Sequence, residues 1–349
     1  MANFHRLPIK DITKETSKSV SLTFDVPAEL NSEFEFKAGQ YITLKCDIDG
    51  EEIRRDYSLC AAPHENEVKV AVKEVEDGMF SKYANNSLKV GDSLDVAAPN
   101  GRFIFNPETN TDNLALFAAG SGITPILGIV KCALSQTDNH VVLVYGNKSK
   151  EDAMFLDEIL ELEKKYAERF HLQLVFSQED VEGAMFGRIE KSTVNFALKN
   201  KFKSVEAKSF YLCGPEAMIH TVKDVLIENG VNKSNILFEL FQVAEPKTEN
   251  PADVPKGQTK VTVILDDETF NFEMSQEDSV LEAALEEDID APYSCQGGIC
   301  STCLARLTEG EAKMRQNNIL TDGELEEGLI LTCQAHPTSE TIVIDYDDV

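Results

Sequence analysis

The chain has 349 residues, and its 61 Asp and Glu outnumber its 33 Lys and Arg, which gives a formal net charge of −28 at pH 7. This length exceeds the usual single hydrophobic core, so we expect two or three domains. The strong negative charge argues against nucleic acid as a partner. The sequence has no run of 18 apolar residues and no signal peptide, so we expect no membrane span and a cytoplasmic protein.

The opening region, residues 1–106, reads as short β-segments in which apolar and polar residues alternate. Examples are residues 19–26, 41–48 and 68–75, with turns that contain Gly or Asn between such segments. Many short strands at regular spacing, without a long helical pattern between them, indicate an antiparallel β-barrel.

Two short motifs lie in this region. Residues 54–59 (RRDYSL) place an Arg, an aromatic ring and a hydroxyl on one strand, where they can meet a phosphate, a ring face and a ring nitrogen. An ordinary edge strand is the alternative. Residues 78–81 (GMFS) put a Gly and a Ser at the start of a short helix, which offers N–H groups and a hydroxyl to an anion. Each motif is weak on its own.

The pattern changes in residues 107–243. Residues 113–119 form an apolar run, as expected of a strand buried on both faces of a parallel sheet. They lead into GSGITP at 120–125 and a helical stretch at 126–134. A strand, a Gly-rich turn and a helix form the setting in which a helix N-terminus receives a pyrophosphate. The motif is not the full G-x-G-x-x-G, so a plain tight turn is the alternative.

Three more strand–helix pairs follow in the same region. They are residues 141–145 with 152–166, 172–176 with 191–199, and 210–213 with 217–228. Regular alternation of strands and helices indicates a doubly wound α/β domain, which binds ligands at the carboxyl ends of its strands.

Residues 244–257 are rich in Pro and charge, and they predict an interdomain linker. The remaining residues, 258–349, predict a hairpin at 260–274, a helix at 279–287 and a final strand at 341–346. This last region holds 21 acidic and 4 basic residues. A solvated surface and an acidic docking face for a basic partner both explain the excess.

Four cysteines of the last region are spaced C-x4-C-x2-C, with 29 further residues before the fourth: Cys295, Cys300, Cys303 and Cys333. This is the spacing of a plant-type 2Fe–2S site, in which four thiolates hold two irons. Glycines in the loop let the backbone approach the sulfurs. Structural zinc usually shows paired C-x2-C knuckles or added histidines, and inert buried thiols are the third alternative.

These motifs, in this order, resemble the ferredoxin–NADP+ reductase superfamily over residues 1–243 and a plant-type ferredoxin of β-grasp fold over 258–349. The fusion, with the reductase part first, is similar to the reductase subunits of phenylacetyl-CoA monooxygenases, and the resemblance covers nearly the whole chain. It implies an FAD-binding β-barrel at 1–106, an NAD(P)-binding α/β domain at 107–243 and a 2Fe–2S ferredoxin-type domain after the linker.

The resemblance also implies roles for residues of the first domain. Arg55 would bind the flavin pyrophosphate, Tyr57 would pack on the isoalloxazine ring, and Ser58 would hydrogen-bond near the flavin N5 atom. Gly78 and Ser81 would line the FAD phosphates. We therefore expect FAD as the flavin, with Tyr57 and Ser58 as catalytic residues.

In the second domain, the resemblance implies that Gly120, Gly122 and Thr124 bind the nicotinamide dinucleotide beside the flavin. Relatives that prefer NADPH often have Arg near positions 148 and 178, where it holds the 2′-phosphate. This chain has a point charge at Lys148 and a neutral Gln178. We expect NADPH as the electron donor, with NADH as the alternative.

Cys213, Gly214 and Pro215 would sit by the nicotinamide, with Cys213 as a third catalytic residue. A small buried thiol at a strand end is the alternative for Cys213. Phe241 lies where relatives place an aromatic ring over the other flavin face, and core packing of Phe238 and Phe241 is the alternative there. The four motif cysteines would bind the 2Fe–2S cluster.

Together these roles imply an enzyme that passes electrons from NAD(P)H through FAD and a 2Fe–2S cluster to an oxygenase partner. Phenylacetyl-CoA epoxidation is the first candidate system. A ring-hydroxylating oxygenase, a haem-thiolate monooxygenase or a desaturase is the alternative acceptor. A regulatory or scaffold protein with cofactor folds as binding modules is the alternative of another class, and the intact set of motifs argues against it.

Overall fold

The computed structural model describes residues 3–241 and 257–349 of the chain. Its contacts divide the chain into two compact units that separate after Phe241. The predicted linker at 244–257 lies, apart from Gly257, outside the described residues. Within the described ranges, no helix is long and apolar enough to cross a membrane.

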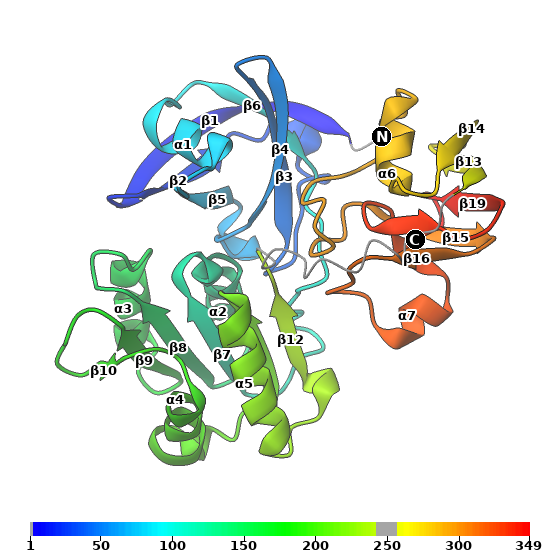
Figure 1. The fold of residues 1–349 in the computed structure, drawn as a ribbon. Helices are drawn as coiled ribbons and strands as arrows, with labels where there is room; N and C mark the ends of the chain where they lie inside the picture. Colours follow the sequence, from blue (N-terminus) through cyan, green and yellow to red (C-terminus); the bar gives the residue numbers. More distant parts are fainter. Residues whose placement is uncertain (1–2, 242–256) are drawn as a thin grey trace. The chain divides into compact units, whose positions relative to one another are not determined.

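The first unit begins with an antiparallel sheet that curls on itself (Figure 1). The order of its strands is β4-β3-β6-β1-β2-β5, and a bridge between Leu59 and Val70 links the end of β4 to the opposite edge strand, β5. The strands are β1 (Phe4–Thr16), β2 (Ser19–Phe24), β3 (Tyr41–Ile48), β4 (Glu51–Ser58), β5 (Val68–Lys73) and β6 (Ser93–Ala97). The predicted antiparallel architecture of this region is confirmed.

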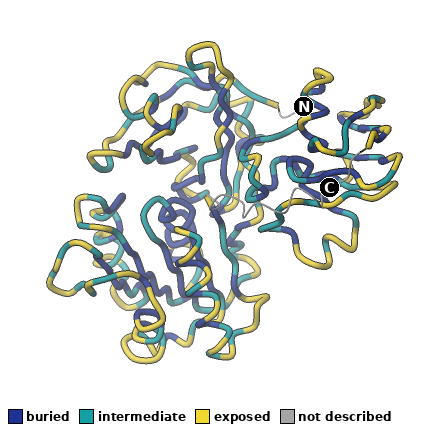
Figure 2. Tube along the Cα trace, viewed as in Figure 1, coloured by how far each residue is buried: buried dark blue, intermediate teal, exposed yellow. Residues whose placement is uncertain are grey.

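Apolar side chains from alternate positions of these strands fill the inside of the curled sheet. Figure 2 shows the buried residues concentrated along the strands. Helix α1 (Met79–Asn86) contributes Phe80 to the same core. The core side chains that are at most 1% exposed include Leu7, Ile9, Leu22, Ile42 and Leu44.

A six-stranded parallel sheet follows in the same unit, with the order β10-β9-β8-β7-β11-β12. Its strands are β7 (Leu114–Ala119), β8 (Val141–Asn147), β9 (Phe170–Phe176), β10 (Met185–Phe186), β11 (Ser209–Cys213) and β12 (Ile236–Glu239). Its helices are α2 (Ile123–Gln136), α3 (Leu156–Lys165), α4 (Lys191–Asn195) and α5 (Glu216–Glu228). Residues 114–118 are all buried, as expected of a strand covered on both faces. The predicted doubly wound architecture is confirmed.

The strand order of this sheet reverses beside β7. From β7 the chain passes through α2 to β8 and then to β9, whereas β11 lies on the other side of β7. Right-handed crossovers then place α2 and α3 on one face of the sheet and α4 and α5 on the other. Ligands of such sheets bind at the carboxyl ends of the strands where the order reverses. Ala119 and Cys213, at the ends of β7 and β11, mark that position.

Two helices of this sheet differ from their predicted bounds. Helix α3 begins at Leu156 rather than at residue 152, because Phe155 has a left-handed backbone (φ 58°) that a helix interior does not accept. The helix predicted at 191–199 is α4, continued by a π-helical stretch at Phe196–Lys201.

The second unit holds a five-stranded sheet with the order β14-β13-β19-β15-β17, in which β13 and β19 are parallel and the other pairs antiparallel. The strands are β13 (Gln258–Leu265), β14 (Glu268–Ser275), β15 (Leu304–Glu309), β17 (Leu329–Leu331) and β19 (Thr341–Asp345). Smaller elements are β16 (Ala312–Met314), β18 (Ala335–Pro337) and α7 (Asp322–Glu326). Helix α6 (Val280–Glu286) begins with a capping box between Ser279 and Glu282, and its apolar face joins the core under the sheet. The predicted β-grasp class is confirmed.

Candidate functional site

Strand β4 carries the first group of predicted site residues. Its alternation turns the side chains of Arg55 and Tyr57 to one face of the strand and that of Ser58 to the other. Arg55 is exposed, and one of its guanidinium nitrogens donates to the Arg54 carbonyl at 2.7 Å. The Tyr57 ring centroid lies 5.4 Å from that of Phe80 in α1. An aromatic platform beside an exposed guanidinium fits a flavin ring and its pyrophosphate.

Gly78 and Ser81 form the turn that begins α1. The Ser81 hydroxyl donates to the Gly78 carbonyl at 3.2 Å and accepts a hydrogen bond from the Val75 backbone N–H at 3.1 Å. A Cβ on Gly78 would lie 2.3 Å from the Ser81 oxygen and 2.5 Å from the Val75 Cγ2 atom, so a larger residue would displace the side chains that brace this turn. The structure therefore gives the Ser81 side chain a bracing role in this turn, and its predicted contact with a phosphate stays a prediction.

The predicted nucleotide-binding glycines lie at the carboxyl ends of β7 and β11. Gly120 has a left-handed backbone (φ 57°) that turns the chain from β7 toward α2. A Cβ on Gly122 would lie 2.2 Å from the Cys213 carbonyl oxygen, and one on Gly214 would lie 3.1 Å from the Ala119 nitrogen. The two strand-end turns thus approach each other through their backbones, and the Met218 side chain lies beside Gly214.

Thr124 and Pro215 belong to the helices that start at these turns. The Thr124 hydroxyl donates to the Ser121 carbonyl at 3.0 Å and is only 3% exposed, so it braces the first turn of α2. Pro215 immediately precedes α5. The starts of α2 and α5 therefore lie next to adjoining strand ends. Their backbone N–H groups can receive the phosphates of a dinucleotide.

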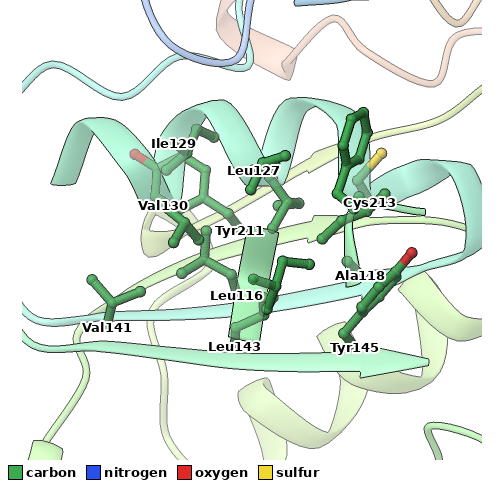
Figure 3. Close-up of a cluster of buried hydrophobic side chains, with 14 of the residues drawn as sticks. Leu116, Ala118, Leu127, Ile129, Val130, Val141, Leu143, Tyr145, Tyr211 and Cys213 are labelled. Carbon is green, nitrogen blue, oxygen red and sulfur yellow. The ribbon is translucent and has the colours of Figure 1, made fainter. Parts of the chain in front are cut away.

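Ser58, Cys213 and Glu239 meet beside these turns from three different strands. The Ser58 hydroxyl donates to the Glu239 carboxylate at 3.1 Å, and Cys213 and Glu239 are paired in register on β11 and β12. Figure 3 shows Cys213 at the edge of the apolar cluster around α2. Glu239 was not among the predicted site residues, because it lies 181 positions from Ser58 in a short strand without a motif.

The electrostatics of this group favour neutral side chains. Burial raises the pKa of Glu239 to about 8, and the hydrogen bond from Ser58 offsets only part of that shift. Burial, with the carboxylate of Glu239 as a second cause, raises the pKa of the Cys213 thiol. At pH 7 the strand ends therefore present a protonated thiol and a mostly neutral carboxyl group.

We expect Glu239→Gln to remove a pH dependence of flavin reduction. With a pKa of about 8, Glu239 becomes an anion as the pH rises through that value. Because Ser58 is predicted to lie near the flavin N5 atom, an anion at its partner Glu239 would oppose the arrival of further negative charge. The wild-type rate should therefore fall above about pH 8, and the rate of the neutral, isosteric variant should not. Rapid-mixing measurements of flavin reduction between about pH 6 and about pH 9.5 check this.

The exposed, ion-paired Glu228 provides the control, as Glu228→Gln. Equal pH profiles for wild type and Glu239→Gln would contradict the prediction.

The pH dependence of the free energy of unfolding offers a second test of the raised Glu239 pKa. The folded chain holds the Glu239 proton more tightly than the unfolded chain does. The stabilisation from this group is therefore complete below the ordinary carboxyl pKa and is lost as the pH rises through about 8.

Lys73, the last residue of β5, reaches the Gly-rich turn from the curled sheet. A Cβ on Gly120 would lie 4.0 Å from the Lys73 Nζ atom. Burial lowers the pKa of Lys73, with Asp152 opposing and Lys148 adding to the shift. Two cations from different sheets, Lys73 and Lys148, thus lie near a turn suited to phosphates. Lys73 was not among the predicted site residues, because nothing in the alternation of β5 distinguishes it.

We expect Lys73→Met to raise the KM for the nicotinamide nucleotide roughly tenfold and to leave kcat nearly unchanged, because one charge-assisted contact to a phosphate is lost. Methionine keeps the apolar stem and removes the charge. Steady-state kinetics with an artificial acceptor measure both constants. Lys69→Met, on the same strand but with its ammonium group 5.7 Å from the Phe155 ring centroid, is the matched control. An unchanged KM would exclude a contact between Lys73 and the nucleotide.

Phe241 is the last described residue of the first unit, and its side chain is 37% exposed. The neighbouring Leu240 is buried. The Lys223 ammonium group lies over the Phe238 ring, 4.8 Å from the ring centroid. The exposure of the Phe241 ring argues against core packing as its role. Its place over the flavin stays a prediction.

The four motif cysteines of the second unit lie in two pairs. A hydrogen bond with Cys300 is the largest cause that lowers the pKa of Cys295 to about 6, and loop N–H groups add to it. The Gly297 nitrogen lies 3.4 Å from the Cys295 sulfur. Cys303 and Cys333 share a thiol hydrogen bond that raises the pKa of Cys303 and lowers that of Cys333.

This donor set fits a 2Fe–2S cluster. Two pairs of thiols, with backbone N–H groups directed at the sulfurs, match two irons that each take two cysteines. In the described part of the chain, no three His, Cys, Asp or Glu side chains gather closely enough to hold a single metal ion. A structural zinc ion would need four ligands around one point, so the pairing favours the cluster.

Three family models match the chain, in the order of the three larger sheets of its described part. A model described as an oxidoreductase FAD-binding domain matches residues 6–105, and one described as an oxidoreductase NAD-binding domain matches residues 116–224. A model of the 2Fe-2S iron-sulfur cluster binding domain matches residues 263–338. The predicted cofactors FAD, NAD(P)H and 2Fe–2S are thereby confirmed.

Curated relatives match this chain over almost their full length, and they include the following two proteins. The chain is 35% identical to a subunit of 1,2-phenylacetyl-CoA epoxidase from Escherichia coli (strain K12), and the match covers 99% of each chain. It is 31% identical to the ferredoxin reductase component of 3-ketosteroid-9-alpha-monooxygenase from Rhodococcus rhodochrous, over 97% of this chain and 96% of the relative. Among solved structures, phthalate dioxygenase reductase shares the fold, with a TM-score of 0.62 and 24% identity over 98% of both chains.

Proposed function

We propose a function from the premise that the chain belongs to the ferredoxin reductase family in which an FAD-binding, an NAD-binding and a 2Fe–2S domain follow one another in one polypeptide. The chain is an NAD(P)H-dependent flavin iron–sulfur oxidoreductase. We assign to it the delivery of electrons to an oxygenase, and specifically to a phenylacetyl-CoA epoxidase.

The meeting of Ser58, Cys213 and Glu239 at the strand-end turns carries the electron-transfer part of this proposal. Ser58 and Glu239 form a hydrogen-bonded pair at the edge of the nucleotide site. Cys213, paired in register with Glu239, is fully buried and borders the site on the side of the apolar cluster around α2. Bound FAD would supply the change from the two-electron chemistry of the nicotinamide to the one-electron chemistry of a 2Fe–2S cluster. The residues of this chain bind and orient the two ring systems, and they exclude water between them.

The outer residues of the site supply charge and stacking. Arg55 would bind the flavin pyrophosphate, and Tyr57 would stack on the flavin ring. Lys73 and Lys148 would neutralise the phosphates of the nucleotide. These phosphates would occupy the space beside Gly120, where a side chain would otherwise project. NADPH is the proposed donor and NADH the alternative.

The structure adds a detail to the choice of donor. The Glu179 carboxylate accepts a hydrogen bond from the Lys150 backbone N–H at 2.7 Å, on the loop that also carries Lys148. A carboxylate and a cation thus share the loops where the 2′-substituent of the nucleotide would bind. The ratio of kcat/KM for NADPH and NADH measures which of them dominates.

The proposed acceptor rests on the match to the Escherichia coli phenylacetyl-CoA epoxidase chain, which runs through both units of this protein. A steroid monooxygenase is a second candidate acceptor, because the Rhodococcus rhodochrous relative matches over a similar length at 31% identity. A non-catalytic scaffold is the remaining class of function. Steady NADPH oxidation with an artificial acceptor would exclude it.

The experiment that tests the proposal begins with the absorption spectrum of the purified protein under anaerobic conditions, before and after addition of NADPH or NADH. We expect flavin and 2Fe–2S bands that bleach together. Reconstitution with the oxygenase components of a phenylacetyl-CoA epoxidase should then give substrate-dependent NADPH oxidation and an epoxide product. A colourless protein would contradict the electron chain, and a reducible protein that fails in the reconstitution would contradict only the acceptor. A cytoplasmic location stays a prediction that cell fractionation tests.

A further inference from the structure

We propose that Thr332 and Tyr346 are positioning residues that hold two of the cluster ligands, Cys303 and Cys333, at a fixed spacing. The inference rests on the proposed binding of a 2Fe–2S cluster by the four motif cysteines. Neither residue belongs to the cysteine motif, and Tyr346 lies at the far end of the domain sequence, directly after β19.

A short chain of buried hydroxyl groups connects the two residues to a ligand. The Tyr346 hydroxyl donates to the Thr332 hydroxyl at 3.0 Å, and the Thr332 hydroxyl donates to the Cys303 carbonyl oxygen at 3.0 Å. The Thr332 backbone N–H donates to the same carbonyl oxygen at 3.1 Å. The carbonyl of one ligand residue is therefore held twice by the residue that immediately precedes another ligand. We refer to Tyr346 and Thr332, with these three bonds, as the hydroxyl clasp.

The hydroxyl clasp is anchored away from the cysteines as well. The Leu281 backbone N–H, in the first turn of α6, donates to the Thr332 carbonyl at 3.1 Å. The Tyr346 backbone N–H donates to the Ile264 carbonyl of β13 at 3.0 Å. Thr332 is fully buried and Tyr346 is 6% exposed, so water does not compete for these bonds. The clasp thus connects Cys303 and Cys333 to α6 and β13 through backbone hydrogen bonds.

The clasp acts where the sheet itself no longer holds the ligands. Leu304 and Leu331 are the terminal pair of the β15–β17 ladder, and Cys303 and Cys333 lie beyond it. Twenty-nine residues of chain separate these two ligands. Past the ladder end, the bonds from Thr332 to Cys303 continue to tie the two segments together. The spacing and order of such ligands control how firmly a cluster is retained, and they tune its reduction potential.

Substitutions that remove one hydroxyl at a time test the clasp in the full-length holoprotein. Thr332→Val and Tyr346→Phe each delete one hydroxyl and keep nearly the same volume. Thr332→Ser retains the hydroxyl and should restore wild-type behaviour. Thr259→Val is the matched control, because Thr259 is 1% exposed in the same domain and its hydroxyl donates to the Ser339 carbonyl at 2.7 Å, outside the clasp.

Three measurements report on the cluster: the rate of its loss in the presence of a chelator, its midpoint potential, and the electron paramagnetic resonance spectrum of its reduced form. We expect Tyr346→Phe, which removes one bond of the clasp, to lose the cluster roughly fivefold faster than wild type, the rate equivalent of one buried hydrogen bond. Thr332→Val removes two bonds of the clasp and should lose the cluster faster still. Both should shift the potential and the spectrum. Thr332→Ser and Thr259→Val should match wild type, and flavin reduction by NAD(P)H should be the same in all five proteins.

Wild-type loss rates and potentials in both Thr332→Val and Tyr346→Phe would overturn the proposal. Equally fast loss in Thr259→Val would also overturn it, because the effect would then be a general loss of domain stability. If Thr332→Val does not assemble a cluster, Tyr346→Phe decides, since its ring keeps the core filled. A wild-type protein without iron and inorganic sulfide would instead overturn the cluster assignment.

Discussion

Replacement of Cys333 by alanine should abolish electron delivery to the acceptor and leave reduction of the flavin intact. Cys333 is the ligand that arrives from a distant segment, and its thiol forms a pair with that of Cys303. Without it, one iron would lose half of its protein ligands, so we expect the 2Fe–2S absorption to disappear and reduction of the oxygenase to fall more than about a hundredfold. The flavin site lies in the other compact unit, so NAD(P)H oxidation with an acceptor that draws electrons directly from the flavin should be unchanged.

Iron and sulfide analysis, the visible spectrum and the two activities measured side by side check this result. Cys46→Ala is the control, because Cys46 is a buried thiol of the curled sheet whose pKa is raised to about 11 by burial, and it has no part in the motif. A cluster retained in Cys333→Ala would contradict the assignment of the fourth ligand. Loss of both activities in Cys333→Ala would contradict the separation of the flavin and cluster steps.

Much of the fold could be predicted because its signals are local. Strand β3 has the predicted bounds, 41–48, since its alternation is uninterrupted, and β7 follows from one apolar run. The cysteine spacing identifies its site because a cluster loop needs three ligands within nine residues. The helices were less accurate at their ends, as at Phe155, where one left-handed residue delays the start of α3.

The residues that sequence analysis missed depend on contacts between distant segments. Glu239 acquires its raised pKa only because β12 places it beside Ser58 of the curled sheet. Lys73 becomes a candidate phosphate ligand only because β5 ends at the Gly120 turn. Tyr346 gains its role only because its hydroxyl reaches Thr332, which lies in the connection between β17 and β18. None of these partners lies at a spacing that a helix or strand period would mark.

Replacement of Gly122 by alanine should nearly abolish the reaction with the nicotinamide nucleotide. A Cβ at this position would lie 2.2 Å from the Cys213 carbonyl oxygen and 2.6 Å from the Gly214 nitrogen. These are backbone atoms of a turn held at the end of β11, so no flexible side chain can move aside. The β7 and β11 turns must then separate by about an ångström. A displacement of that size at a reacting site costs roughly a hundredfold in rate, and the overpacking costs about 1–3 kcal/mol of stability.

Rapid-mixing kinetics of flavin reduction and thermal unfolding of Gly122→Ala measure the two effects. Gly323→Ala is the control, since a Cβ on Gly323 of α7 has no neighbour within 4 Å. The cluster and its spectrum should be unaffected in both variants, because Gly122 belongs to the other compact unit and a Cβ on Gly323 meets open space. Wild-type flavin reduction in Gly122→Ala would mean that the β7 and β11 turns move apart without consequence, and the nucleotide would then have to bind away from the position where the strand order reverses. Loss of rate with unchanged unfolding would place the effect in the site geometry alone, because the contact between the turns would then serve the reaction rather than the stability of the domain.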